Sequence, residues 1–277
     1  MKTVKTIRAN PLIAFFILAF VMTWALWIPA LATKLNGGIP ALGPDSPVGQ
    51  VARWSPGIAA ILLAFALAGK QGLKTLFQPM GVWRLHPGWF LIAVLLPPVI
   101  FFAARFIDLA FGDSYQVLYP LASITAPLAF VIPIAVISAI PGAFAEELGW
   151  RGFALPRLQT KASALVTSII VALVWGIWHV PSMVYFGETQ AIYIVLAVLN
   201  FIPITILYTW MYNNTRGSLL LVTLFHVSQQ LSNYFLGLIP TATDEILIWI
   251  IAAAVILLSG MQRKRAEVCI GALQTDS

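Results

Sequence analysis

Long apolar stretches constrain the fold of this chain more than any other feature of its sequence. Most of them approach the roughly 20 residues that a helix needs to cross the hydrocarbon core of a bilayer. Their approximate bounds are 11–32, 51–69, 89–111, 120–143, 162–181, 190–212, 217–239 and 245–261. Because backbone polar groups inside a bilayer must be hydrogen-bonded internally, we predict an all-α, polytopic bundle of about eight transmembrane helices.

The low charge content argues against the main alternatives. Only 9% of the 277 residues are Asp, Glu, Lys or Arg, against roughly 25% in an average soluble domain. So little charge could not cover the surface of a soluble chain of this length, which disfavours a soluble enzyme, a disordered protein and a nucleic-acid-binding domain. The single cysteine, Cys269, excludes an internal disulfide and a cysteine-based metal cluster.

The N-terminal stretch has two interpretations. Lys2, Lys5 and Arg8 precede it, and Ala30-Leu31-Ala32 at its end resembles the cleavage site of a signal peptide. Its apolar run is longer than the roughly 7–15 residues found in signal peptides and is long enough to span a bilayer. We therefore expect it to be retained as the first transmembrane helix.

The distribution of Lys and Arg predicts the orientation. With the N-terminus in the cytoplasm, every Lys and Arg except Lys34, Arg53 and Arg105 falls on the cytoplasmic side. Both termini are then cytoplasmic, and 262–277 is a cytoplasmic tail. We expect the chain, 1–277, to form one integral-membrane domain of the cell membrane, and the tight loops favour a bacterial plasma membrane.

A few ionisable residues lie in or beside the apolar stretches. Glu146, Glu147 and Arg151 follow directly on the fourth stretch, His179 lies near the end of the fifth, and His226 lies inside the seventh. A charged side chain at the centre of a bilayer costs about 2.5 kcal/mol or more, so such residues tend to face a protein interior or a water-filled cavity. These five residues are therefore the first candidates for a functional site within 120–239.

Helical spacing divides the candidates into groups. Glu147 and Arg151 are four residues apart and can pair, which leaves Glu146 on a neighbouring face. His226, Gln230 and Asn233 form one stripe of a helix that is otherwise rich in Leu, Val and Phe. That stripe is expected to line something polar.

Each candidate also has a structural interpretation. A single His in a membrane helix can serve as a hydrogen-bonding partner between helices, and Glu146 and Glu147 can be acids at the membrane surface. The simple topology also separates the candidates, because it places Glu146 at the cytoplasmic end of one stretch and His179 towards the external end of the next. Pro181 would allow the helix with His179 to end early inside the protein. The joint occurrence of two acids and two histidines in so charge-poor a region favours a functional site.

At these residues the sequence resembles the CAAX-protease and bacteriocin-processing (CPBP) family of intramembrane proteases, also called the Abi family. The family's first motif, Glu-Glu-x-x-x-Arg, matches Glu146 to Arg151. Its second, an aromatic residue and a His separated by three residues, matches Trp175 and His179, although the aromatic residue is usually Phe. The resemblance covers about 53–233.

The third family motif pairs a His with a polar residue four positions later. His226 and Gln230 match it, although the second residue is usually Asn. This departure leaves two candidates for the polar partner of His226, namely Gln230 and, one turn further along the stripe, Asn233.

The resemblance implies a CAAX-type intramembrane endopeptidase that hydrolyses a peptide bond in a membrane-associated or lipidated substrate. Hydrolysis needs an activated water and donors for the developing oxyanion. We assign Glu146 as general base, with His179 helping to hold the water. His226, with Gln230 or Asn233, would donate hydrogen bonds to the oxyanion.

The role of a metal is open at this point. The pair of Glu147 and Arg151 would fix the helix that presents Glu146. Alternatively, Glu146, His179 and His226 match the ligand count of a catalytic zinc, in which case Glu147 would become the base. An HExxH sequence is absent, and the family resemblance implies a metal-independent glutamate protease, so we favour the glutamate-type mechanism, which needs no cofactor, over a zinc metalloprotease.

Two other functions compete with proteolysis. One is a non-catalytic membrane immunity or scaffold protein of the same fold. The other is a proton-coupled transporter in which Glu and His relay protons, although transporters often contain internal repeats and none is visible here. The expected partners are membrane lipid and a membrane-associated or lipidated peptide or protein substrate, and no nucleic acid.

Overall fold

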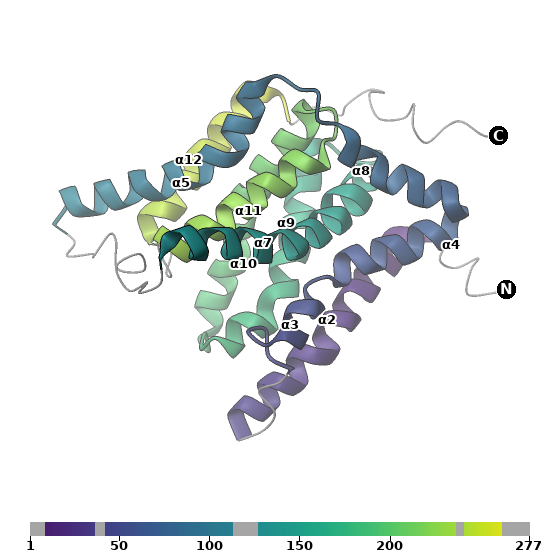
Figure 1. The fold of residues 1–277 in the computed structure, drawn as a ribbon, viewed down its shortest axis with the longest axis horizontal. Coiled ribbons are helices and arrows are strands. Elements are labelled where there is room, and N and C mark those ends of the chain that lie inside the picture. The colour runs from purple at the N-terminus through teal and green to yellow at the C-terminus, as the bar shows by residue number, and fades with distance from the viewer. Residues whose placement is uncertain (1–8, 37–41, 113–126, 237–240, 262–277) are drawn as a thin grey trace.

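The computed structural model describes residues 9–36, 42–112, 127–236 and 241–261, and these residues form helices without a strand. Figure 1 shows the arrangement. The long helices are α2 (Pro11–Asn36), α4 (Ser55–Phe77), α5 (Pro87–Ala110), α7 (Leu128–Glu147), α9 (Ala164–Tyr185), α10 (Ala191–Asn214), α11 (Leu219–Leu236) and α12 (Ala242–Ser259). Shorter pieces are α3 (Pro47–Ala52), the 3-10 helix η2 (Gln78–Gly81), the π-helix η3 (Leu148–Ala154) and α8 (Leu155–Gln159). The prediction of an all-α fold is confirmed.

Among the described residues, 7 helical segments are long and apolar enough to cross a membrane. They account for all the predicted stretches but one, so the multi-pass architecture is confirmed. The remaining stretch, expected at 217–239, forms α11. It does not qualify because Gln229, Gln230 and Asn233 interrupt its apolar sequence. This helix packs against α5 and α7 inside the bundle.

The start of α2 and the end of α12 lie on the same side of the bundle. Near the start of α2, Phe15 stacks on Phe153 with ring centroids 5.2 Å apart. Just after α12, the carbonyl of Met261 accepts a hydrogen bond from the backbone N–H of Leu165. The predicted cytoplasmic location of the termini and of the tail concerns 1–8 and 262–277, which lie outside the described residues.

The fourth apolar stretch extends further than its sequence indicates. The prediction placed its end near residue 143, but the candidate span runs over Ala129–Gln159 because α7, η3 and α8 follow one another without a loop. Glu146 lies 13 residues before the end of this span, and His179 lies 15 residues after the start of α9. At a rise of about 1.5 Å per residue, both distances are about 20 Å. The expected separation in depth of Glu146 and His179 was therefore wrong.

The segment between α2 and α4 folds back along α2. The hydroxyl of Thr23, in the middle of α2, donates a hydrogen bond to the carbonyl of Ala52 (2.9 Å). The hydroxyl of Ser55 donates to the carbonyl of Ala19 (2.9 Å). Consequently α4 begins halfway along α2, and Arg53, just before α4, lies at that level.

Two glycines allow the start of α4 to approach the end of α7 and η3 closely. A Cβ atom on Gly57 would lie 2.8 Å from the carbonyl oxygen of Ala145, and one on Gly149 would lie 2.5 Å from Pro56. Real Cβ atoms do not come this close to other heavy atoms. This packing brings the residues preceding α4 next to the glutamates at the end of α7.

A polar cluster joins α5 to α12 away from those glutamates. The guanidinium of Arg105 donates to the carboxylates of Asp108 (2.9 Å) and Asp244 (2.6 Å) and to the hydroxyl of Thr241 (2.8 Å). Both carboxylates are buried, so the cluster satisfies charges that would be costly to leave unpaired. It fixes the start of α12 against the end of α5.

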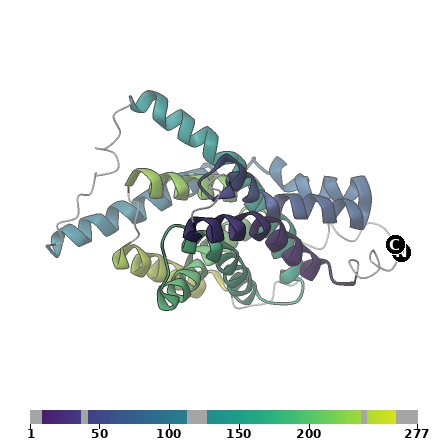
Figure 2. The same ribbon diagram turned by 90° about the horizontal axis from the view of Figure 1, so that it is seen from below.

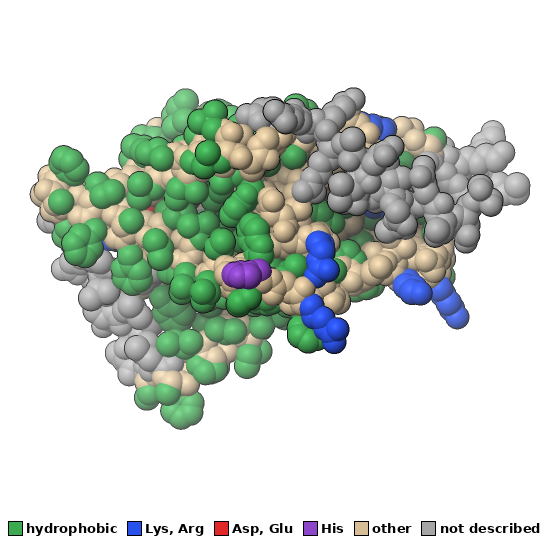
Figure 3. Space-filling model, turned by 90° about the horizontal axis from the view of Figure 1, so that it is seen from above, with side chains coloured by type: hydrophobic (Ala, Val, Ile, Leu, Met, Phe, Trp, Pro, Cys, Tyr) green, Lys and Arg blue, Asp and Glu red, His purple; other side chains and the backbone are tan. Residues whose placement is uncertain are grey.

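The surface is largely apolar, as expected for contact with lipid. On the face drawn in Figure 3, hydrophobic side chains predominate, and Lys and Arg side chains gather towards one side. The first turns of α7 stand apart from the other helices (Figure 2) and expose Phe130, Ile134 and Ile137. Since burial of such side chains is the main driving force of folding in water, their exposure identifies these turns as lipid-facing.

Candidate active site

Glu146, the penultimate residue of α7, is fully buried and bound by two donors. Its Oε1 accepts a hydrogen bond from the guanidinium of Arg53 (3.0 Å), and its Oε2 accepts one from the indole N–H of Trp175 (2.8 Å). Each carboxylate oxygen has a second lone pair. Glu146 can therefore accept a further proton or hydrogen bond without losing either partner.

Glu147 forms a separate network with Arg151 of the first motif and His226 of the third. Its Oε1 accepts hydrogen bonds from Arg151 (2.9 Å) and from Nδ1 of His226 (2.8 Å), and all three side chains are buried. The predicted pairing of Glu147 with Arg151 is confirmed. The guanidinium of Arg151 also lies over the ring of Tyr208, 4.0 Å from its centroid, which further fixes its position.

Trp175 lies at the centre of the site. Its ring centroid is 5.7 Å from those of both His179 and His226, and the guanidinium of Arg151 lies 4.6 Å from it. Because Trp175 also donates to Glu146, it connects side chains from α7, α9, η3 and α11. The candidates that the sequence distributes over four segments are thus gathered around one indole.

His179 is oriented by its own helix. Its Nδ1 lies 2.9 Å from the carbonyl oxygen of Trp175. A carbonyl only accepts hydrogen bonds, so Nδ1 carries the proton and Nε2 carries the lone pair. The ring also packs against Trp178 and Phe201, with centroids 4.6 and 5.0 Å away. His179 therefore presents a fixed acceptor that is suited to hold a water molecule.

The structure distinguishes the two polar candidates on α11. The side-chain nitrogen of Gln230 lies 3.1 Å from Nε2 of His226. With Nδ1 of His226 donating to Glu147, Nε2 is the acceptor and Gln230 the donor. Asn233 is exposed and lines a neighbouring cavity instead. Of the two predicted partners, Gln230 is the one in contact with His226.

Sequence reasoning missed Arg53. Its side chain is 27% exposed while the Glu146 carboxylate that it binds is 0% exposed, so Arg53 reaches from a partly open position into the buried site. A signal was present, since Arg53 is one of only three basic residues that break the Lys and Arg asymmetry. The distance of 93 residues between Arg53 and Glu146 concealed their contact.

The metal-binding alternative fits the arrangement poorly. Among the described residues, no group of three or more His, Cys, Asp and Glu side chains is placed to hold a metal ion. Of the predicted ligands, Glu146 is bound by Arg53 and Trp175, and both ring nitrogens of His226 have protein partners. These contacts would have to be exchanged before zinc could bind.

An apolar cavity of about 290 Å³ adjoins the site, and Trp175 forms part of its lining. It lies among α5, α9, α10, α11 and α12. Polar side chains, among them Asn200, Gln229, Asn233 and Glu245, line part of its wall. The remaining lining is Pro97, Ile100, Phe101, Trp175, Ala197, Phe201, Ile204, Phe225, Asp244 and Ile248.

Comparison with known proteins gives a family match over one segment of the chain. Residues 127–232 match the family described as Rce1-like, Type II CAAX prenyl endopeptidase Rce1-like. This segment contains the two buried glutamates, both histidines of the site, Arg151 and Gln230. Arg53 and Asn233 lie outside it.

Individual relatives extend the match towards the N-terminus. A CAAX prenyl protease 2 of Methanococcus maripaludis is 29% identical over 177 residues, which cover 60% of this chain and 64% of the relative. Lysostaphin resistance protein A of Staphylococcus haemolyticus is 28% identical over 225 residues, 77% of this chain and 58% of the relative. The corresponding Staphylococcus aureus protein (strain Newman) is 25% identical over 212 residues, 75% and 47%.

The chain thus spans between about half and two thirds of the length of these curated relatives. The chain is therefore a multi-pass membrane protein whose residues 127–232 match the Rce1-like CAAX prenyl endopeptidase family.

Proposed function

We propose that this chain is an intramembrane endopeptidase in which Glu146 activates water to hydrolyse a peptide bond of a membrane-associated or lipidated substrate. The main support is the buried carboxylate of Glu146, held by Arg53 and Trp175 beside His179. A carboxylate at this depth is costly, and this arrangement orients it without using all of its acceptor capacity.

In the first step, a water held between Glu146 and Nε2 of His179 attacks the carbonyl carbon of the scissile bond. Glu146 takes one proton from the water as the new C–O bond forms. The carbonyl oxygen becomes the oxyanion of a tetrahedral intermediate. Arg53 holds Glu146 in place for this step.

The oxyanion requires donors, and the contact between Gln230 and His226 supports these two residues for that role. The Gln230 amide can donate directly. When protonated, His226 can donate from Nε2, and that positive charge is stabilised by Glu147 at Nδ1. In the second step Glu146 returns its proton to the leaving nitrogen, the C–N bond breaks, and a carboxylic acid and an amine are released.

The cavity beside Trp175 supports an apolar substrate segment. Its lining is predominantly hydrocarbon and aromatic, so it can hold a lipid chain or apolar side chains of the substrate in contact with the site. The proposed catalytic region, 120–239, then supplies both the chemistry and most of the cavity. Arg53 contributes to the site from outside that region.

The central test is a cleavage assay in reconstituted proteoliposomes. Since one relative is named a CAAX prenyl protease, the first probes are a prenylated CAAX peptide and its unprenylated counterpart. We expect Glu146→Gln to lower kcat by about 10²–10⁴-fold, the usual contribution of a general base, and His179→Ala and His226→Ala to lower it strongly. The test extends to unknown substrates by comparing membrane peptides between cells. Uncleaved peptides that accumulate with Glu146→Gln, and not with the wild type, are candidate substrates.

Matched controls come from the same chain. His86 is the third histidine, and it caps α5 by accepting a hydrogen bond from the backbone N–H of Gly88. His86→Asn preserves an acceptor there and should retain activity. Glu188→Gln removes a carboxylate in the turn after α9, where Oε1 accepts a hydrogen bond from the backbone N–H of Gln190, and should also retain activity. Equal cleavage by wild type and all three site variants would contradict the assignment.

A second candidate is a non-catalytic resistance or immunity protein of the same fold. The relatives named lysostaphin resistance protein A favour it. On this hypothesis, the phenotype conferred by the chain would persist with Glu146→Gln. No peptide would accumulate in cells that lack the chain. The proton-coupled transporter gains no support from these relatives.

A further inference from the structure

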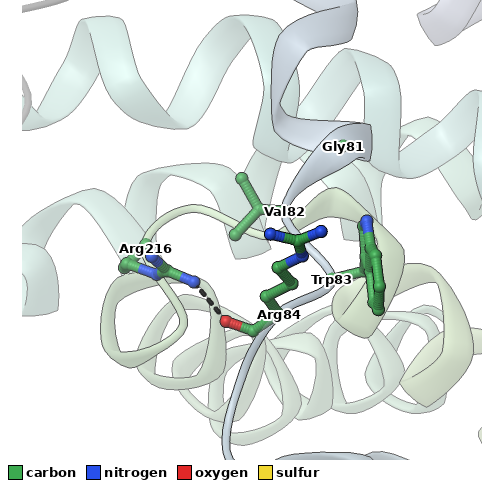
Figure 4. A pocket seen from close by; sticks show the side chains of 5 residues that line it. All are labelled: Gly81, Val82, Trp83, Arg84 and Arg216. Atoms are coloured by element: carbon green, nitrogen blue, oxygen red, sulfur yellow. Dashed lines mark hydrogen bonds between the residues drawn. The ribbon is translucent and has the colours of Figure 1, made fainter.

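A second cavity lies away from Glu146, between the segment joining η2 to α5 and the turn joining α10 to α11. It has a volume of about 420 Å³ and is lined by Gly81, Val82, Trp83, Arg84 and Arg216. Figure 4 shows that the two arginines approach it from separate segments. Two guanidinium groups thus line a cavity to which neither the proposed catalytic step nor the apolar cavity assigns a role.

The fold holds these two segments together. The hydroxyl of Ser218 donates to the carbonyl oxygen of Val82 (2.7 Å), and the guanidinium of Arg216 donates to the carbonyl oxygen of Arg84 (Figure 4). Arg216 has a φ of 54°, in the left-handed region that L residues rarely adopt. A non-glycine residue is therefore held in a costly backbone conformation where its side chain reaches across to the other segment.

The cavity carries positive charge that the described residues do not neutralise. No carboxylate in the described part of the chain forms an ion pair with Arg84 or Arg216, and both side chains are exposed. Arginine pairs bind phosphate oxygens through several N–H donors at once. An anion with several oxygen acceptors matches this pair best.

Trp83 indicates where that anion comes from. Its side chain is 57% exposed, and the guanidinium of Arg84 lies 5.2 Å from the centroid of its ring. The cavity lies just before α5 begins and just after α10 ends, at the ends of two membrane-spanning helices. Exposed Trp beside Arg at such a level is typical of the headgroup region of a bilayer.

We propose that Trp83, Arg84 and Arg216 form a binding site for the phosphate group of an anionic phospholipid. Basic pockets between membrane helices bind lipid headgroups in this way. The site is independent of the proposed peptidase chemistry, because it shares no residue with the groups around Glu146. Inorganic phosphate offers the same oxygens, so the experiment has to separate the two sources.

Fluorescence quenching tests the wild-type chain directly. The chain is reconstituted in nanodiscs of phosphatidylcholine that contain brominated phosphatidylglycerol or, in the matched sample, brominated phosphatidylcholine. The contribution of Trp83 is the difference between wild type and Trp83→Phe. We expect this contribution to be quenched more by the brominated phosphatidylglycerol. Equal quenching by the two lipids would overturn the proposal. This measurement keeps both arginines in place, so it does not depend on whether the arginine variants fold.

Native mass spectrometry of the detergent-solubilised full chain tests the arginines. Arg84→Ala removes one guanidinium, and Arg216→Gly removes the other while favouring the left-handed backbone at that position. Each should weaken the retention of short-chain phosphatidylglycerol about fivefold, the effect of one basic residue near an anionic surface. Lys74→Ala removes an exposed positive charge from α4 and is the matched control. Undiminished retention by the double arginine variant would overturn the site.

Sodium phosphate provides the last arm. If phosphatidylglycerol binds and millimolar sodium phosphate displaces it only weakly, the lipid source is supported. If sodium phosphate protects the chain against thermal unfolding as well as phosphatidylglycerol does, and the arginine variants abolish both effects, the phosphate site stands and its lipid source is overturned.

Discussion

The indole N–H of Trp175 donates to Oε2 of Glu146 across 2.8 Å, so the second motif of this chain is bonded directly to the first. A Phe, the usual residue of the family motif at this position, could contribute only its ring. The departure from the pattern thus adds a donor to the proposed general base.

We expect Trp175→Phe to preserve the aromatic packing around His179 and His226 and to lower kcat about tenfold or more. A hydrogen bond to a charged group contributes about 1.5–3 kcal/mol, and here it orients the base. Steady-state kinetics should show the loss in kcat rather than in KM. Trp27→Phe is the control, since the buried indole N–H of Trp27 donates to the carbonyl oxygen of Gly49 and not to the site. An unchanged kcat for Trp175→Phe would refute this role.

Arg53→Ala should lower both activity and stability, because it leaves the buried carboxylate of Glu146 without its cation. As Arg53 is partly exposed, water replaces part of the interaction, and we expect a loss of about 1–3 kcal/mol in stability. Arg53→Lys should recover most of it. Thermal unfolding in detergent and the kcat of the three proteins provide the comparison. Arg53→Ala behaving as wild type in both measurements would exclude a positioning role.

Arg151→Ala should be more damaging, since Arg151 and Glu147 are both fully buried. Removal of one partner from a buried pair costs about 3–5 kcal/mol. The double variant Glu147→Gln with Arg151→Met removes both charges and keeps an acceptor for His226, so it should regain much of the thermal stability. Activity should stay low in the double variant, because the protonated form of His226 loses the Glu147 carboxylate that stabilises it. A double variant as unstable as Arg151→Ala would contradict this account.

Gln230 and Asn233 can be separated by one pair of substitutions. We expect Gln230→Ala to lower kcat about 10²–10³-fold, the effect of removing an oxyanion donor, and Gln230→Asn to recover part of that loss. Asn233→Ala should leave kcat unchanged and alter at most KM, since Asn233 lines the apolar cavity. The reverse order of effects would transfer the assignment to Asn233.

Chelation tests the choice between the glutamate and zinc mechanisms. We expect activity to persist after prolonged treatment with a membrane-permeant zinc chelator, because Glu146 and His226 are already engaged with protein partners. The measurement is the initial rate before and after treatment, with the metal content of the sample determined in parallel. Activity that disappears and returns on addition of zinc would establish the metalloprotease alternative.

The apolar stretches were sufficient to predict the helices, since hydrophobicity and length alone decide which segments can span a bilayer. They did not predict where the fourth span ends, because the charges of Glu146, Glu147 and Arg151 were interpreted as a polar boundary of the membrane. In the fold these charges neutralise one another or are neutralised by residues distant in sequence, so the helix continues through them as η3 and α8.

The predicted pairing of Glu147 with Arg151 was correct because both lie on one helix at a spacing that fixes their geometry. The contacts of Glu146 with Arg53 and Trp175 could not be predicted in the same way. They depend on how α4 and α9 pack against α7, which helical periodicity does not encode. Arg53, in particular, lies in a segment that folds back along α2, whereas the sequence placed it at the external end of the second apolar stretch.

The unequal exposure of Arg53 and Glu146 has a consequence for how reactants reach the site. Arg53 forms a partly exposed edge of the site, whereas the apolar cavity adjoins the site at Trp175. On the proposed mechanism, the two reactants have separate supply routes, with water entering past the guanidinium and the hydrocarbon part of the substrate entering from the lipid phase. Substitutions on one route should then limit access of one reactant to the site and leave access of the other unchanged.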